Sequence, residues 1–149
     1  MAVIRITKEF KFEMAHALWG YDGPCKNIHG HSYYLYVTII GSPINNPQSP
    51  KNGMVIDYSV LKKIIKEHIT DRLDHALVVN INTPHKELES FKNMFDNMVM
   101  VPYQPTCENL ICDMALKIQK HLPKEVKLHS LKLSETVTSF AEWYASDNQ

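Results

Sequence analysis

A chain of 149 residues lies in the size range of one domain, and its 44% hydrophobic and 21% charged residues are typical of a globular protein, so we expect a single domain over residues 1–149. The 16 basic and 16 acidic residues give a formal net charge of zero, which argues against a protein that binds nucleic acid through phosphates. The N-terminus lacks an apolar signal core and no segment has membrane-spanning length, so we expect no membrane contact and a cytoplasmic location.

Two strands are predicted at the start of the chain. From Val3 to Phe12, apolar residues recur with a period of two that breaks around Lys8 and Glu9, which indicates a strand with an irregularity. Ser32 to Ile40 is rich in Tyr, Val, Thr and Ile and predicts a second strand. The connecting segment contains several Gly and a Pro, so Cys25 should lie on or beside a loop, where reactive groups commonly sit.

Two helices are predicted in the middle of the chain. Asp57 is a suitable N-cap for a helix over Tyr58 to Arg72, in which apolar residues follow one helical face. A second helix should begin after Thr106 as its N-cap, with its apolar stripe ending before a proline. Between the two helices, Asn80 to Gln104 could form a short helix followed by a short extended piece.

Two more strands are predicted near the C-terminus. They cover Lys127 to Leu133 and Phe140 to Ala145, joined by a polar turn. Two antiparallel hairpins separated by two helices predict an α+β fold, in which an antiparallel sheet carries the helices on one face. The open edges of such a sheet need protection or are used for assembly.

Three histidines are placed to share one ion. His29 and His31 flank Gly30, and residues two apart on an extended chain project to the same face. His16 lies just past the first strand, so an antiparallel hairpin should bring it opposite the start of the second. Three histidines with an open fourth position are typical of a catalytic zinc site. The remaining histidines have no comparable partners and are interpreted as helix-face or surface residues: His68, His85, His121 and His129.

Cys25 precedes this histidine pair, with three residues between it and His29. The three cysteines make an odd count in a chain without an export signal, so we expect no disulfide framework and a free Cys25. As a fourth ligand it would close the site into a structural one. If it stands near the ion without binding it, the positive charge would lower the pKa of the thiol and supply a thiolate base or nucleophile. The spacing leaves both possibilities open.

Two further segments carry groups suited to chemistry. Asp74 and His75 follow the first helix at the expected start of a loop, where the pair could act as a general acid and its orienting partner, although such an Asp is often a solvated cap. Glu135 follows a strand, where it could accept paired hydrogen bonds from an amide-like heterocycle or serve only as a turn residue.

Several segments in order resemble the family of 6-pyruvoyltetrahydropterin synthases and 6-carboxy-5,6,7,8-tetrahydropterin synthases. They span nearly the whole chain: "FKFEMAHAL", "CKNIHGHSY", "GMVIDY", "RLDHALVVN", "PTCENL" and "LSETVTSFAEWY". The resemblance implies the tunnelling fold, a four-stranded antiparallel sheet with two helices on one face. In that fold, subunits assemble through their sheets into an oligomeric β-barrel, commonly a homohexamer of two trimers. Asn80 to Gln104 looks longer than in short family members, and Cys107 replaces a small residue.

The resemblance also implies roles for the candidate residues. It implies a zinc ion on His16, His29 and His31. Cys25 corresponds to the catalytic base, Asp74 and His75 to a charge-relay pair, and Glu135 to the anchor of the pterin ring. We also expect Thr106 to bind substrate. Because family sites lie between subunits, Cys25 and the Asp–His pair can come from different chains.

The spacer between Cys25 and His29 bears on the reaction. Three intervening residues are typical of the family branch that makes 6-carboxy-5,6,7,8-tetrahydropterin for queuosine, whereas the animal pyruvoyl enzymes have a longer spacer. We therefore expect conversion of 7,8-dihydroneopterin triphosphate to the carboxy product with release of acetaldehyde and triphosphate. The alternatives are the pyruvoyl synthase reaction on the same substrate and a non-catalytic zinc-binding module.

Overall fold

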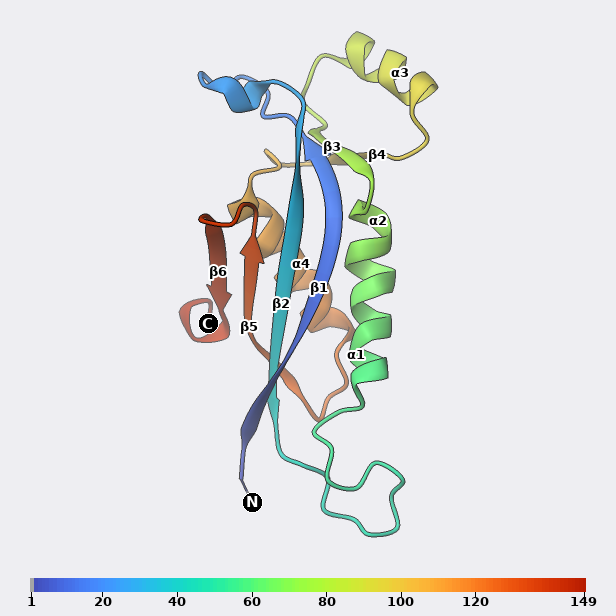
Figure 1. Cartoon of the computed structure of the whole chain (residues 1–149), viewed down its shortest axis with the longest axis vertical. Helices are drawn as coiled ribbons and strands as arrows, with labels where there is room; N and C mark the ends of the chain where they lie inside the picture. The colour runs from blue at the N-terminus through green and yellow to red at the C-terminus, as the bar shows by residue number, and fades with distance from the viewer. Residues whose placement is uncertain (1) are drawn as a thin grey trace.

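The computed structural model describes residues 2–149, apart from the side chains of residues 85–87, and consists of one curved sheet with helices packed against it (Figure 1). The strands are β1 (Ile4–His16), β2 (His29–Gly41), β3 (Ala76–Asn80), β4 (Met98–Val101), β5 (Lys127–Ser134) and β6 (Phe140–Tyr144). The helical elements are η1 (Pro24–Lys26), α1 (Tyr58–Ile65), the π-helical turn η2 (Lys66–Thr70), α2 (Asp71–Leu73), α3 (His85–Met94), α4 (Cys107–His121) and η3 (Ala145–Asp147).

The sheet has six strands in the order β4-β3-β1-β2-β5-β6 and is mixed. The α+β class is confirmed, but the expected four-stranded antiparallel sheet is wrong. β1, β2, β5 and β6 pair antiparallel as expected, whereas β3 pairs parallel with β1 and β4 pairs parallel with β3. The segment after Asp74 was expected to be a loop. It forms β3 because the run ALVVN is apolar and β-branched enough to be buried between two neighbouring strands.

β1 and β2 form the long hairpin that carries the site. Every residue from Ile4 to His16 has a partner on β2, so the irregularity expected around Lys8 and Glu9 is wrong. The alternation of side chains between the two faces of β1 continues through Lys8. The Lys8 ammonium lies 5.8 Å from the centre of the Phe10 ring, so this charged side chain is accommodated on the strand by a cation–π contact. The irregularity in register lies instead between Thr38 and Ile39, where β2 pairs with β5.

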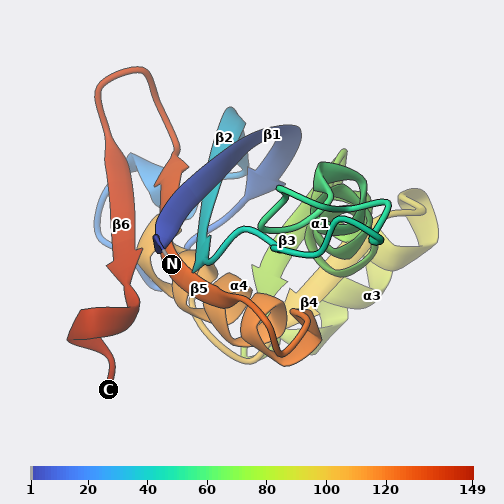
Figure 2. The ribbon, with the colours of Figure 1, turned by 90° about the horizontal axis from the view of Figure 1, so that it is seen from below.

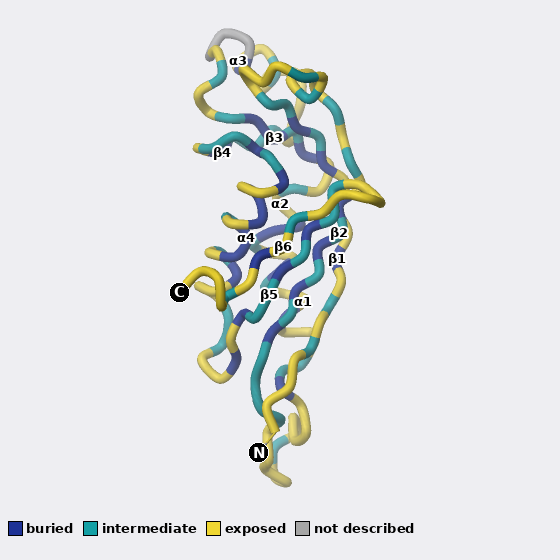
Figure 3. The backbone as a smooth tube through the Cα atoms, turned by 90° about the vertical axis from the view of Figure 1, so that its left-hand side faces the viewer, coloured by how far each residue is buried: buried dark blue, intermediate teal, exposed yellow. Residues whose placement is uncertain are grey.

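The helices start where the sequence predicts. The Asp57 side chain accepts a hydrogen bond from the Ser59 amide at the start of α1, and α1, η2 and α2 run on from one another to Leu73. Figure 2 shows α1 and α4 side by side, and alternate residues of β1, β2 and β5 pack with them into one core. In β1 the buried residues lie in the C-terminal half, from Phe10 to His16, and exposed residues gather towards the N-terminus of the chain (Figure 3).

The segment between the two long helices contains the expected short helix, α3, and the expected extended piece, β4. α3 projects beyond the end of the sheet that carries β3 and β4 (Figure 1). The two edge strands of the sheet are β4 and β6. Within residues 2–149, no helix combines the length and hydrophobicity needed to cross a membrane.

Candidate active site

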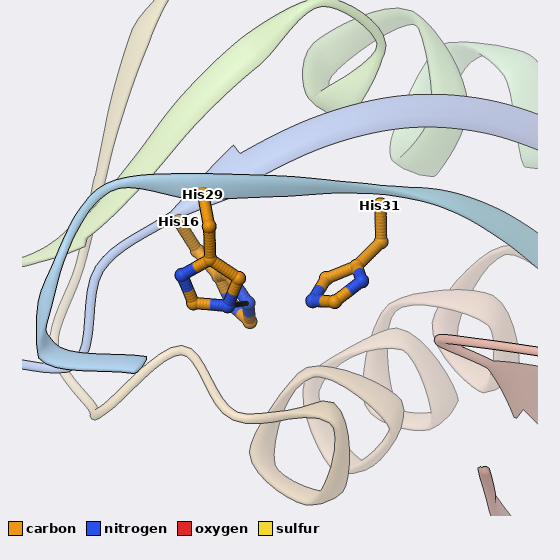
Figure 4. A group of neighbouring side chains, drawn as sticks. All are labelled: His16, His29 and His31. Carbon is orange, nitrogen blue, oxygen red and sulfur yellow. Dashed lines mark hydrogen bonds between the residues drawn. The ribbon is translucent and has the colours of Figure 1, made fainter. Parts of the chain in front are cut away.

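The β1–β2 register gathers the three predicted histidines on one face of the sheet. His16 pairs directly with His29, as predicted, and Met14 pairs with His31. Because side chains alternate along a strand, His29 and His31 project to the same face, and His16 projects to that face from the neighbouring strand. The nitrogen atoms that each ring offers all lie within 4.8 Å of one another (Figure 4).

Backbone carbonyls fix the tautomers of two of these rings. The Nδ1 atom of His16 lies 2.7 Å from the Pro105 carbonyl oxygen, and the Nδ1 atom of His29 lies 2.8 Å from the Asn27 carbonyl oxygen. A carbonyl oxygen only accepts hydrogen bonds, so each Nδ1 carries the hydrogen and each neutral ring presents a lone pair at Nε2. The two Nε2 atoms face each other at 3.0 Å. This is the orientation that hydrogen-bonded partners impose on histidines that bind a metal.

His16 is suited to remain neutral. It is 1% exposed, and burial lowers the pKa of its imidazole below the ordinary value of 6.5. The neighbouring His29 and His31 lower it further, while the Pro105 hydrogen bond and the Glu135 charge act in the opposite direction. A neutral imidazole is the form that binds a metal ion. The cluster therefore fits a divalent cation with nitrogen ligands, such as zinc.

Glu135 lies against the histidine cluster. It follows β5, and its Oε1 atom is 3.5 Å from Nε2 of His16 and 3.6 Å from Nε2 of His31. Its amide donates a hydrogen bond to the Ser139 carbonyl at 3.1 Å, which anchors the backbone within the β5–β6 hairpin. Its side chain is only partly exposed. The carboxylate therefore faces the space that the histidines surround.

Tyr33 is a site residue that the sequence reasoning missed. It is 0% exposed, and its hydroxyl donates a hydrogen bond to Oε1 of Glu135 at 3.4 Å. Burial, followed by the Glu135 charge, raises the pKa of its phenol above the ordinary value of 10.0, so the hydroxyl stays protonated. The signal was present in the sequence, because Tyr33 continues the alternation of His29 and His31 on the same face.

Cys25 lies in η1, within the loop that joins the two strands, as predicted. Its carbonyl oxygen accepts a hydrogen bond from the Leu18 amide at 3.0 Å, which ties the two sides of the loop together. The thiol is free and the residue is half-buried. Among the described residues, the group of converging ligand atoms consists of the three histidines and does not include the Cys25 sulfur.

Asp74 and His75 form a pair at the start of β3. Oδ2 of Asp74 lies 3.2 Å from Nδ1 of His75, and Oδ1 of Asp74 accepts a hydrogen bond from the Glu13 amide at 2.9 Å. That hydrogen bond is the main cause of the lowered pKa of the Asp74 carboxyl. His75 adopts a φ of 57°, a left-handed conformation at the turn into β3. It is 79% exposed and lines a cleft of about 830 Å³ with Phe91 and Phe95.

Among the described residues, the Asp74–His75 pair is not hydrogen-bonded to the three histidines, although His75 and His31 line the same cleft. The pair is attached to β1 through Glu13, whose partner on β2 is Ser32, one residue after His31. No hydrogen bond or ion pair found within residues 2–149 joins His75 to the three histidines. One chain therefore brings together His16, His29, His31 and Glu135 but leaves the Asp–His pair facing outwards.

Thr106 is adjacent in sequence to Pro105, whose backbone carbonyl contacts His16 in the site. It follows Pro105, whose carbonyl holds His16, and its hydroxyl accepts a hydrogen bond from the Asn109 amide at 3.2 Å as the N-cap of α4. The next residue, Cys107, is buried and donates its thiol hydrogen to the Leu133 carbonyl at 3.3 Å. Burial, with the Glu135 charge, raises the pKa of this thiol to about 11. It therefore packs between α4 and β5 as an unreactive thiol.

The other histidines lie outside the cluster. His68 and His121 stack on each other with ring centres 3.6 Å apart, a partnership that the sequence reasoning did not foresee. His129 lies on β5 with its ring edge against Tyr144. The side chain of His85 is outside the described residues. The three described histidines are not part of the converging group of ligand atoms.

Comparison with known proteins gives a consistent result. A family model described as 6-pyruvoyl tetrahydropterin synthase matches residues 5–146. A Haemophilus influenzae protein named 6-carboxy-5,6,7,8-tetrahydropterin synthase is 37% identical over 143 residues, covering 95% of this chain and 99% of that protein. An Aquifex aeolicus protein of the same name is 31% identical over 161 aligned positions, covering 93% and 96%. The solved structure of Caenorhabditis elegans 6-pyruvoyl tetrahydropterin synthase superimposes with a TM-score of 0.69 at 25% identity, covering 97% of both chains.

Proposed function

Because the chain belongs to the 6-pyruvoyl tetrahydropterin synthase family, we propose that it is a zinc-dependent 6-carboxy-5,6,7,8-tetrahydropterin synthase of queuosine biosynthesis. Its substrate is 7,8-dihydroneopterin triphosphate. The observation that carries the proposal is the convergence of the Nε2 atoms of His16 and His29, with their tautomers fixed, beside His31. The names of the relatives and the three-residue spacer between Cys25 and His29 support the carboxy product.

The overall reaction balances without an external oxidant or reductant. The substrate and one water molecule give 6-carboxy-5,6,7,8-tetrahydropterin, acetaldehyde and triphosphate. The first side-chain carbon stays on the ring as the carboxylate, and the bond to the second carbon breaks, so that the outer two carbons leave as acetaldehyde. The ring gains two hydrogens while the side chain is oxidised. The protein therefore has to bind the substrate and move protons.

The three histidines would hold the zinc ion. Zinc bound there would stabilise negative charge on the hydroxyl groups of the substrate side chain and so make them more acidic. His16 and His29 contribute Nε2 atoms whose partner nitrogens are fixed by backbone carbonyls, and His31 contributes the third nitrogen. With three protein ligands, such a site leaves a position for substrate.

Cys25, Asp74 and His75 would transfer the protons. We assign Cys25 as the base, because it lies on the loop beside the histidines and is not part of the converging ligand group. Asp74, fixed by the Glu13 amide, orients His75 through Nδ1 and leaves the other ring nitrogen free to exchange a proton. Because the pair faces outwards, we propose that it serves the histidine site of a neighbouring subunit.

Glu135 and Thr106 would bind the pterin ring. A carboxylate can accept two hydrogen bonds side by side, one from the ring amino group and one from N3. Glu135 is partly exposed and held at the histidine cluster by Tyr33, which supports this assignment. Thr106 lies on the segment that holds His16 and would contribute to the same wall of the site.

We further propose a homohexamer of two trimers. The sheet ends in two open edges, β4 and β6, which family members cover by assembly. Exposed apolar side chains at both ends support burial in an interface, among them Met94 at 71%, Phe95 at 49% and Phe140 at 53% exposed. Light scattering on the purified protein should give six chains per particle, whereas a monomer would contradict the assignment of an inter-subunit site.

The test of the proposed function is product analysis. Zinc-loaded protein incubated with 7,8-dihydroneopterin triphosphate should yield the carboxy product, identified by mass, together with acetaldehyde. A product that retains the three-carbon side chain would identify the pyruvoyl synthase reaction instead. Unchanged substrate with zinc bound, together with a sulfur neighbour about 2.3 Å from the zinc by X-ray absorption, would identify a closed, non-catalytic site completed by Cys25.

A further inference from the structure

We propose that Glu135 is the fourth ligand of the His16, His29 and His31 site when no substrate is bound, and that Tyr33 holds it in that position. Pterin binding would then remove the carboxylate from the cation and open the coordination position. The inference rests on the proposed metal site. It adds to the three-histidine site a carboxylate that alternates between the cation and the pterin ring.

The distances around Oε1 of Glu135 are those expected between neighbouring ligand atoms. With bonds of 2.0–2.1 Å, the ligand atoms of a tetrahedral zinc site lie about 3.3 Å apart. Oε1 lies 3.5 Å from Nε2 of His16 and 3.6 Å from Nε2 of His31, and the two facing Nε2 atoms are 3.0 Å apart. The oxygen therefore lies at ligand spacing from two of the three nitrogens.

The position of this oxygen is supported from two sides. The Tyr33 hydroxyl donates to the same Oε1 atom at 3.4 Å, from a side chain that is fully buried between the histidines and the core. The Glu135 amide donates to the Ser139 carbonyl at 3.1 Å, so the hairpin fixes the backbone. A hydroxyl that hydrogen-bonds to a ligand oxygen orients it as outer-shell partners of metal sites do.

The charge in the site favours the same arrangement. Three neutral imidazoles leave both charges of a divalent cation uncompensated, in a site where His16 is buried and His29 and His31 are half-buried. The converging group itself consists of the three histidines. The Glu135 carboxylate lies outside that group but supplies a negative charge next to the Nε2 atoms of His16 and His31. A carboxylate oxygen is an ordinary zinc ligand in such sites. Glu135 therefore compensates part of the charge until a substrate replaces it.

The consequence is a coupling between ring recognition and access to the cation. If the pterin amino and N3 hydrogens engage the Glu135 carboxylate, that carboxylate has to leave the cation. The coordination position would then open only for a molecule that carries the ring donors. The site would thereby select a hydroxylated side chain attached to a pterin over other hydroxylated molecules.

Cobalt(II) spectroscopy on the full-length protein tests this arrangement without relying on turnover. The visible bands of bound Co²⁺ report the ligand set and geometry. Glu135→Gln should change the spectrum, whereas Glu142→Gln, a carboxylate on β6, should leave it as in wild type. Unsubstituted pterin, which has the ring donors but no hydroxylated side chain, should shift the wild-type spectrum towards that of Glu135→Gln and leave the variant unchanged.

Zinc affinity gives a second readout by competition with a chelator. Outer-shell partners typically contribute 10–100-fold to metal affinity, so we expect zinc binding to weaken about 10-fold in Tyr33→Phe and about 100-fold in Glu135→Gln. Tyr34→Phe, on the opposite face of β2, should bind zinc as wild type does.

Three results would overturn the proposal or part of it, in distinguishable ways. If wild type binds Co²⁺ and Zn²⁺ but Glu135→Gln has the same spectrum and affinity, Glu135 is not a ligand, and the proposed function is unaffected. If wild type binds neither ion, the proposed metal site fails and the inference fails with it. Should Glu135→Gln not fold, the pterin titration of wild type decides, since an unchanged spectrum overturns the coupling.

Discussion

The Nε2 atoms of His16 and His29 face each other at 3.0 Å, while the Nδ1 atom of each ring is hydrogen-bonded to a backbone carbonyl. Two neutral imidazoles in this orientation direct two lone pairs at one point, and a cation at that point converts the repulsion between them into binding. The relationship follows from a direct cross-strand pair at the end of β1 and the start of β2. The hairpin register therefore determines where the histidine cluster, and with it the proposed metal site, lies.

Replacing a half-buried ligand should remove the metal without unfolding the chain. We expect His29→Ala to weaken zinc binding by at least about 100-fold, the upper end of what outer-shell partners contribute, because a direct ligand is lost. His129→Ala, on β5 and outside the cluster, is the matched control and should keep one zinc per chain. Elemental analysis after dialysis measures both. Full zinc retention in His29→Ala would place the metal elsewhere.

Cys25→Ala should separate catalysis from metal binding. As the proposed base lies outside the converging ligand group, the variant should keep its zinc while turnover falls by about 10²–10⁴-fold, the usual effect of losing an acid–base residue. Cys112→Ala, which removes an exposed thiol, should be active. Zinc content and initial rates are measured on the same samples. Loss of zinc together with the thiol would instead make Cys25 a ligand.

The Asp74 hydrogen bond should stabilise the fold in a pH-dependent way. The Glu13 amide lowers the pKa of this carboxyl below its ordinary value of 3.8, so its stabilisation is present above pH 3.8 and is lost as the pH falls through the lower folded value. Because the Asp74 side chain is partly exposed, we expect Asp74→Asn to lower the free energy of unfolding by only about 1 kcal/mol near pH 7. This corresponds to a decrease of roughly 2–4 °C in Tm.

The control is Asp96→Asn, whose side chain lines the same cleft. Thermal unfolding of both variants and wild type should be followed from neutral to acidic pH. The difference between wild type and Asp74→Asn should shrink as the solution becomes acidic, and Asp96→Asn should follow wild type throughout. A difference that is constant with pH would show that the ionised carboxylate is not the source.

The histidine cluster could be predicted from sequence because it depends on local rules. Alternation along a strand places His29 and His31 on one face, and an antiparallel hairpin brings the end of one strand to the start of the next. The caps of α1 and α4 are likewise local, because Asp57 and Thr106 bond to amides two and three residues away.

The parallel strands β3 and β4 and the position of Glu135 depend on long-range contacts that the sequence pattern does not reveal. β3 and β4 are short apolar runs, and their parallel pairing with β1 and with each other joins segments separated by 18 or more residues. The proximity of Glu135 to His16 and Tyr33 depends on how β5 packs beside β2, because Glu135 is more than 100 residues from both of them in sequence. No local periodicity encodes that approach.

Mixing two inactive variants should test whether the site is shared between chains. In Cys25→Ala a chain retains His75, and in His75→Ala a chain retains Cys25. When the two are refolded together in equal amounts, about a quarter of randomly assembled inter-subunit sites should have both residues, so activity should recover to roughly a quarter of wild type. Each variant refolded alone is the control. If Cys25 and His75 of one chain acted together, the mixture would stay inactive.

The most direct measurement of the central claim is the ratio of acetaldehyde to triphosphate released by the zinc-loaded protein from 7,8-dihydroneopterin triphosphate. The proposed reaction predicts one acetaldehyde for each triphosphate throughout the time course, with the carboxy product accumulating at the same rate. Triphosphate released without acetaldehyde would contradict the claim and identify a pyruvoyl synthase. Release of neither from protein with its zinc bound would contradict catalysis on this substrate.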